Sequence, residues 1–170
     1  ATAVDSNVAI ADADTGDSNT CNLGGADSGL FTCTLSGQTA YSIAFSSAPD
    51  YETPNSAAGS NEYAVTVTIN DGSNNGATIS YTVTVGDAND QTPVYQAADS
   101  DDAITVNENV GTGSIDAGTI TDTDTVGTLA CTLGGADAAD FACTISDKTV
   151  NIAFAADPNY ESPADADTNN

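Results

Sequence analysis

Two stretches of the chain, residues 21–33 and 131–143, carry nearly the same sequence. Both begin and end with cysteine, both contain Leu-Gly-Gly-Ala-Asp, and eight of their thirteen positions are identical. The offset between them is 131 − 21 = 110 residues. Repetition at a fixed long period indicates a tandem array of one structural unit, and a unit of about 110 residues has the size of an ordinary domain. We therefore expect the chain to fold as copies of one domain.

The charge of the chain restricts its partners. The sequence holds 25 acidic residues, one basic residue and no histidine, for a formal net charge of −24. Phosphate contacts need Lys and Arg, so we expect no binding to nucleic acid or to an anionic membrane surface. No stretch approaches the roughly 18 apolar residues of a membrane span, so no membrane insertion is expected in this sequence. So much negative charge opposes compaction through self-repulsion. Multivalent cations or a salty medium would offset this repulsion. A solvated acidic surface without a binding role is the alternative interpretation.

Strict alternation of apolar and small polar residues predicts strands. Residues 63–69 read Tyr-Ala-Val-Thr-Val-Thr-Ile, and residues 79–85 repeat the pattern. The turn formers of residues 70–78 lie between them, so the sequence predicts a β-hairpin. In the second of these strands, the side chains expected to point inward are Ile79, Tyr81, Val83 and Val85.

The same alternation predicts strands around both repeated stretches. Residues 31–35 and 41–45 flank a turn at Ser36-Gly37, and residues 129–133 and 141–145 form a second set. No segment has convincing helical periodicity, and the short Ala-Asp pieces could form one helical turn at most. Many short strands joined by Gly, Asn and Asp turns predict an all-β fold of tandem Greek-key, immunoglobulin-like β-sandwiches.

The repeat also suggests domain boundaries. We expect one sandwich in residues 1–90, without its first strand, and a second in residues 91–170, without its last strands, with a linker around residues 87–95. The second copy stops before its counterparts of the 63–69 and 79–85 strands, which would leave an open core and an unpaired edge. Either the sequence is a window of a longer array, or another molecule supplies the missing strands.

Four cysteines occur in two copies of one spacing. Zinc sites favour closer cysteine pairs, and the sequence has no histidine. The spacing therefore favours the disulfides Cys21–Cys33 and Cys131–Cys143 over a metal site. Disulfides indicate an oxidising, extracytoplasmic compartment.

Five acidic motifs follow one another in a recognisable order. They are Asp50-Tyr-Glu52, Asn70-Asp71, Asp87-Ala-Asn89-Asp90-Gln-Thr-Pro93, Val106-Asn-Glu108 and Asp122-Thr-Asp124. In order and spacing they resemble the motifs of cadherin repeats, of the kind found in large bacterial surface proteins. The resemblance implies Ca²⁺ as the cofactor, held by carboxylate and carbonyl oxygens where two repeats meet.

Three calcium junctions are implied by this resemblance. The residues expected at a central junction are Asp50, Glu52, Asp87, Asn89, Asp90, Asp122 and Asp124. An upstream junction would use Asp12, Asp14 and Asp71, and a downstream junction would use Glu108 and Glu161. The sequence departs from the family at Asn159, which replaces an Asp, and at Thr125, since the family's Asn after Asp-x-Asp is missing. The competing interpretation is that the Asp loops only cap turns.

Catalysis finds no support, because a nucleophile needs an activating base and the sequence offers no His and no Arg. We therefore expect a non-enzymatic protein at the cell surface, adhesive or structural, forming a stalk, surface layer or filament that calcium stiffens. Its partners would be further repeats of the same chain or other copies of itself. The alternative function is a self-assembling filament subunit, completed by strands from a neighbouring chain. A carbohydrate- or ice-binding module is the least favoured class.

Overall fold

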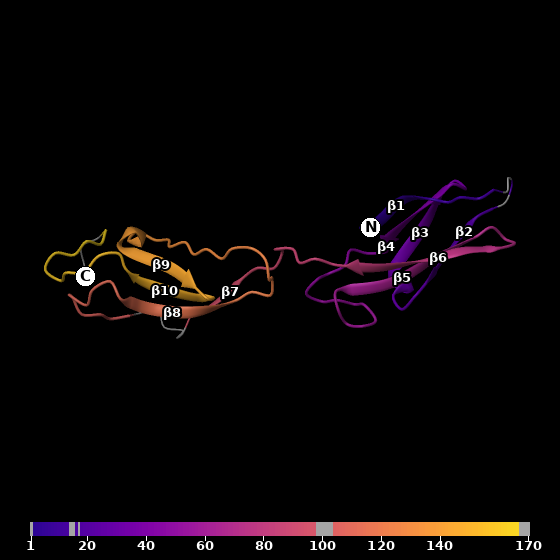
Figure 1. Ribbon diagram of the computed structural model, residues 1–170. Coiled ribbons are helices and arrows are strands. Elements are labelled where there is room, and N and C mark those ends of the chain that lie inside the picture. Colours follow the sequence, from indigo (N-terminus) through magenta and orange to yellow (C-terminus); the bar gives the residue numbers. More distant parts are fainter. Residues whose placement is uncertain (1, 14–15, 17, 98–103, 167–170) are drawn as a thin grey trace. The chain divides into compact units, whose positions relative to one another are not determined.

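The computed structural model describes residues 2–13, 16, 18–97 and 104–166 (Figure 1). The chain divides into two compact units, Ala1–Ala88 and Asn89–Asn170. The described helices are single 3-10 turns, Ser28–Leu30 and Ala138–Asp140, as the sequence allowed. In the described part of the chain, no helix is both long and apolar enough to cross a membrane.

Unit 1 is a β-sandwich of two three-stranded antiparallel sheets, which confirms the predicted all-β class. The first sheet has the order β1–β4–β3, built from β1 (Ala3–Ala9), β4 (Ala40–Phe45) and β3 (Phe31–Ser36). The second has the order β2–β5–β6, built from β2 (Thr20–Gly24), β5 (Glu62–Asn70) and β6 (Asn75–Thr84).

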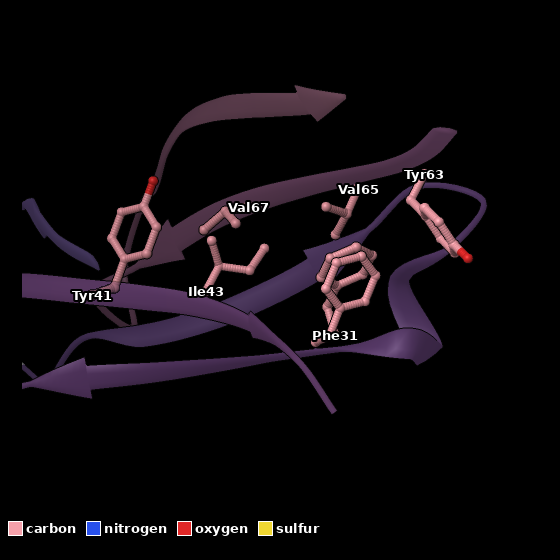
Figure 2. Packing of buried hydrophobic residues seen from close by; sticks show 7 residues of the cluster. Phe31, Tyr41, Ile43, Tyr63, Val65 and Val67 are labelled. Carbon is pink, nitrogen blue, oxygen red and sulfur yellow. The ribbon is translucent and has the colours of Figure 1, made fainter. Parts of the chain in front are cut away.

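The core of unit 1 lies between these sheets, and the alternation of the sequence creates it. Figure 2 shows side chains of β3 and β4 directed toward those of β5. Ile43 is fully buried, and Tyr63, Val65 and Val67 of β5 are each 1% exposed. The rings of Phe31 and Phe45 stack with centroids 4.4 Å apart, and Tyr63 meets Phe45 edge-on at 5.2 Å. Burial of one such side chain contributes about 1.5–3 kcal/mol.

The predicted hairpin of residues 63–69 and 79–85 is confirmed as β5 and β6, with one error. Tyr81, Val83 and Val85 pack against the core as expected, but Ile79 is 42% exposed. Ile79 lies opposite the buried Val67. β6 is the edge strand of its sheet, and Ile79 lies closer to the turn at Asn70–Asn75 than Tyr81 and Val83, which pack against the core.

Unit 2 contains one four-stranded antiparallel sheet with the order β7–β8–β10–β9. Its strands are β7 (Val94–Ala97), β8 (Ser114–Thr121), β10 (Thr149–Phe154) and β9 (Phe141–Ser146). β9 and β10 repeat the pairing of β3 and β4, since Phe141 lies opposite Phe154 as Phe31 lies opposite Phe45. The rings of Phe141 and Phe154 also stack, with centroids 5.1 Å apart.

The strand predicted at residues 129–133 is wrong. These residues form no strand, whereas the matching residues of unit 1 form β2. β2 exists because it pairs with β5. The alternation is present at residues 129–133, but the described part of unit 2 provides no strand to pair with it.

Both predicted disulfides are confirmed, Cys21–Cys33 and Cys131–Cys143, each with Cα atoms 6.2 Å apart. The first joins β2 to β3, which belong to different sheets. It therefore links the two layers of the sandwich, not two neighbouring strands of one sheet. The second holds the segment of residues 129–133 to β9 in the same way.

Candidate metal centre

The strand register of unit 1 separates the acidic residues expected as ligands into two groups at opposite ends of the sandwich. Glu62 pairs with Thr84 at one end of the β5–β6 hairpin, and Asn70 pairs with Asn75 at the other. The loop of residues 46–61 and the segment after β6 therefore meet at the first end, where the Val85 N–H donates to the Asn61 carbonyl at 2.9 Å. This end carries the expected ligands Asp50, Glu52 and Asp87.

The opposite end of unit 1 carries two of the three residues expected upstream. Asp71 lies in the β5–β6 turn, and Asp12 precedes β2 in the sequence. β2 begins at this end because Thr20 pairs with Asn70. The third expected ligand, Asp14, lies outside the described residues.

Asp50 and Asp71 each cap a turn. Asp50 Oδ1 accepts the backbone N–H groups of Glu52 at 3.0 Å and Thr53 at 3.1 Å. The hydroxyl and backbone N–H of Thr53 lower the pKa of the Asp50 carboxyl. Asp71 Oδ1 accepts the N–H groups of Ser73 at 2.7 Å and Asn74 at 2.6 Å, and these bonds, with Asn74 first, lower the pKa of Asp71.

The substitution of Asn159 for the Asp of this motif keeps the same turn in unit 2. Asn159 Oδ1 accepts the N–H groups of Glu161 at 3.0 Å and Ser162 at 3.2 Å, as Asp50 does in unit 1. The turn needs an oxygen acceptor and not a charge. The cap alone is therefore no argument for a metal at Asp50.

The acidic residues near the start of unit 2 converge on Asp124. Val94 pairs with Thr121, so the residues before β7 lie beside those after β8. The Gln91 N–H donates to Asp124 Oδ2 at 2.9 Å, and the Asp124 N–H donates to Asp122 Oδ1 at 3.2 Å. One carboxylate oxygen of Asp90 and one of Asp124 lie within 4.8 Å of each other. The geometry brings together three of the expected ligands, Asp90, Asp122 and Asp124.

Asp124 is the most unusual of these groups because it is 5% exposed. Its Oδ1 is buried and has no hydrogen-bond partner among the residues that the structure describes. A buried carboxylate oxygen without a partner carries a desolvation cost of about 1–3 kcal/mol or more. A cation beside it would remove that cost. Carboxylate and amide oxygens are the ligands that Ca²⁺ takes, so the donor set fits that ion.

A cavity of about 370 Å³ lies beside these residues and is lined by Asn89, Asp122 and Asp124 among others. The Asn89 side chain lies over Gly127, whose φ is +97°; a Cβ built there would be 2.6 Å from Asn89 Oδ1. Lys148 also lines this cavity, and its Nζ donates to the Asp122 carbonyl at 2.9 Å. The chain's one basic residue thus offsets part of the negative charge here, which sequence reasoning missed.

The opposite end of unit 2 holds the residues expected downstream. Glu108 Oε2 accepts the Tyr160 N–H at 3.2 Å, which brings Glu108 next to the turn that contains Glu161. Both lie at the end of the sheet where Ser114 pairs with Ala153, away from the Val94–Thr121 end. Each unit therefore carries acidic residues at both ends.

Sequence reasoning did not single out Asp27, the last residue of the repeated Leu-Gly-Gly-Ala-Asp. Asp27 is 5% exposed, and its two carboxylate oxygens accept the N–H groups of Ala57 and Ala64, each at 2.6 Å. In the second copy, Asp137 Oδ1 accepts the Ala166 N–H at 2.6 Å. The two alanines match at the 109-residue offset (57 + 109 = 166). Recurrence of the Asp in both copies was the available signal, and it marks a structural carboxylate.

Comparison with known proteins finds similar solved structures. No family model and no curated protein matches the chain. A crystal structure of the protocadherin GammaB4 extracellular domain is similar over 84% of this chain, with 21% identity and a TM-score of 0.47. The chain covers 22% of the length of that protein.

Proposed function

We propose that the chain is a calcium-binding structural or adhesive module of the cell exterior, whose units are stiffened by Ca²⁺ at their acidic ends. Asp90, Asp122 and Asp124, with Asn89, would form the unit 2 part of the central site. Asp50, Glu52 and Asp87 would complete it from unit 1. Asp12, Asp14 and Asp71 would serve an upstream site, and Glu108 and Glu161 a downstream one.

One observation carries this proposal: the buried Asp124 carboxylate whose Oδ1 has no partner among the described residues. Turn capping explains the hydrogen bonds of Asp50 and Asp71. It does not explain Asp124, whose Oδ1 accepts no hydrogen bond from the described residues. The nearby Asp90 carboxylate adds like charge at a distance where repulsion is strong. A divalent cation there would turn the repulsion into attraction.

The stiffening follows from charge and position. Without a cation, the acidic ends repel one another, and a net charge of −24 favours separation of the units. With Ca²⁺ bound, carboxylates from both units would share one ion, and the residues around 87–91 would lose their freedom to rotate. The two disulfides support a location outside the cytoplasm, where reducing agents do not act on them.

A second candidate function is a filament subunit that takes strands from a neighbouring chain. Residues 129–133, which form no strand in the described part of unit 2, are the segment with which such strands would pair. The two functions are compatible, because the acidic end and this segment use different residues.

Calcium titration of the full chain by calorimetry tests the metal site. We expect Asp124→Asn to weaken calcium affinity about tenfold or more, because it removes the charge of the buried ligand. Asp90→Asn provides a second ligand variant on an exposed side chain. Asp140→Asn is the matched control: it removes the same charge from unit 2 in a 3-10 turn outside the proposed sites. The proposal would be contradicted if the titration shows no heat of calcium binding, or if all variants bind calcium with equal affinity.

A further inference from the structure

The single basic residue of the chain lies in the turn that joins β9 to β10. Ser146 pairs with Thr149, so this turn consists of two residues, Asp147 and Lys148. Both have positive φ, at 48° and 61°. A two-residue turn of this kind favours Asn-Gly or Gly-Gly, because a Cβ is strained at positive φ. The sequence therefore keeps a lysine where glycine would cost less backbone free energy, and such strain persists where other interactions offset it.

The corresponding turn of unit 1 is longer and carries no basic residue. Three residues, 37–39, join β3 to β4 there. The Ile10 N–H donates to the Thr39 carbonyl at 2.7 Å, and the Ile120 N–H donates to the Lys148 carbonyl at 2.7 Å. In both units the turn is thus bonded through its backbone to the segment that leads to the Asp-x-Asp motif. This contact uses a backbone carbonyl, so it does not require a lysine side chain.

A neutral side chain in the turn of unit 1 makes a different contact. Gln38 Oε1 accepts the Asn19 N–H at 2.6 Å, and the Gln38 carbonyl accepts a hydrogen bond from Asn19 Nδ2 at 3.0 Å. Gln38 therefore holds the segment that precedes β2 without any charge. Because a neutral residue serves in unit 1, the stability of the turn does not by itself explain Lys148.

The Lys148 side chain reaches the acidic cavity of unit 2. Its Nζ donates to the Asp122 carbonyl at 2.9 Å, and Lys148 lines the same cavity of about 370 Å³ as Asp122 and Asp124. The acceptor is a backbone carbonyl, so this bond occupies no carboxylate oxygen. Asp122 Oδ1 accepts the Asp124 N–H, and Asp124 Oδ1 is buried without a partner among the described residues. Lys148 thus brings a positive charge to the cavity while this bond leaves the carboxylates available to a metal.

We propose that Lys148 is a tethered cation that sets the calcium affinity of this site, an inference that rests on the function proposed above. Without a metal, its charge offsets part of the repulsion between the carboxylates of Asp122 and Asp124. A Ca²⁺ ion held by these carboxylates shares the cavity with the ammonium group, and the two positive charges repel each other. Lys148 therefore stabilises the metal-free centre and weakens the metal-bound one, so that the site fills at higher calcium concentrations than its carboxylates alone would allow.

Lys148→Met is the test variant, because methionine keeps an unbranched side chain at the same positive φ and removes the charge. In calorimetric titration of the full chain with Ca²⁺, we expect this variant to bind about tenfold more tightly than the unmodified chain. Lys148→Arg keeps the charge and should bind as the unmodified chain does. Thr144→Glu is the matched control for net charge: it also makes the chain more negative by one unit, at an exposed position in the middle of β9, where Thr144 pairs with Asn151.

Three further measurements separate the charge of Lys148 from a structural role in the turn. In chelator, Lys148→Met should lower the urea midpoint of unit 2 below that of the unmodified chain, and saturating calcium should remove this difference, because the variant gains more from the ion. Higher monovalent salt should narrow the affinity gap between Lys148→Met and the unmodified chain, because salt screens the repulsion. In an Asp124→Asn background, Lys148→Met should change calcium affinity much less, since the two residues act on the same ion.

The outcomes distinguish this inference from the metal site on which it rests. Equal calcium affinity of Lys148→Met and the unmodified chain would overturn the role of Lys148 and leave the metal site in place. Equal tightening by Thr144→Glu would also overturn it, because net charge and not the position of Lys148 would then set the affinity. An affinity gap that neither salt nor Asp124→Asn changes would overturn it in favour of a structural effect on the turn. Absence of calcium binding by every variant would instead overturn the metal site itself, and the affinity role of Lys148 with it.

Discussion

At the scale of single residues, the carboxylates of this chain perform different tasks that composition cannot separate. Asp50 and Asp71 cap exposed turns, Asp27 holds buried backbone, and Asp124 has a buried oxygen without a partner in the described structure. The distinction lies in burial and in the number of N–H groups that each oxygen accepts. Asn159 shows the limit of motif reading, because it keeps the turn without the charge.

Asp27 provides a prediction at this scale. Asp27→Ala removes two hydrogen bonds from backbone N–H groups to a buried carboxylate, each worth about 1.5–3 kcal/mol. We expect the free energy of unfolding of unit 1 to fall by about 3 kcal/mol or more, measured by urea denaturation. Asp137→Ala is the matched comparison. Its carboxylate is only half-buried and makes one such bond that is described, so its cost should be clearly smaller. Equal costs would contradict this role of Asp27.

At the scale of elements, the predicted strands formed where the alternating segment had another strand to pair with. The 31–35, 41–45, 63–69 and 79–85 segments became β3, β4, β5 and β6. Residues 129–133 have the alternation of β2 but form no strand, because pairing depends on a second segment that local pattern does not report. Ile79 was misplaced for a similar reason, since its exposure depends on how far along the edge strand β6 the core extends, which alternation does not report.

The acidic site was predictable in part. The resemblance of the acidic motifs to those of cadherin repeats implied that Asp90, Asp122 and Asp124 belong together, and the β7–β8 register brings them to one end of unit 2. The burial of Asp124, the position of Lys148 and the contact of Asn89 with Gly127 could not be predicted, because each depends on tertiary packing.

The two disulfides give a prediction about elements. Replacing Cys21 and Cys33 together by Ser should lower the free energy of unfolding of unit 1 by about 3 kcal/mol, because the crosslink between residues 12 apart in sequence no longer restricts the unfolded chain. Replacing Cys131 and Cys143 together should instead free residues 129–133, which no strand holds, and leave β9 and β10 paired. Hydrogen exchange by mass spectrometry separates these outcomes. Loss of protection throughout β9 and β10 in the second variant would contradict the second expectation.

At the scale of the whole molecule, charge and repetition dominate. The 170 residues include 25 acidic side chains and one basic side chain, which gives a formal net charge of −24. Each unit carries acidic residues at both ends of its sheets, an arrangement that suits a linear array with a cation at each junction. Monovalent salt screens such repulsion over about 8–10 Å, but it does not bridge two carboxylates as a divalent ion does.

The most direct test of this account is small-angle X-ray scattering of the full chain with calcium and with a chelator, at matched ionic strength. If Ca²⁺ stiffens the connection between the units, the maximum dimension and radius of gyration should be larger and more sharply defined with calcium than with chelator. Asp124→Asn should give the chelator result under both conditions, and Asp140→Asn should behave as the unmodified chain. Identical scattering curves with and without calcium would contradict the central claim.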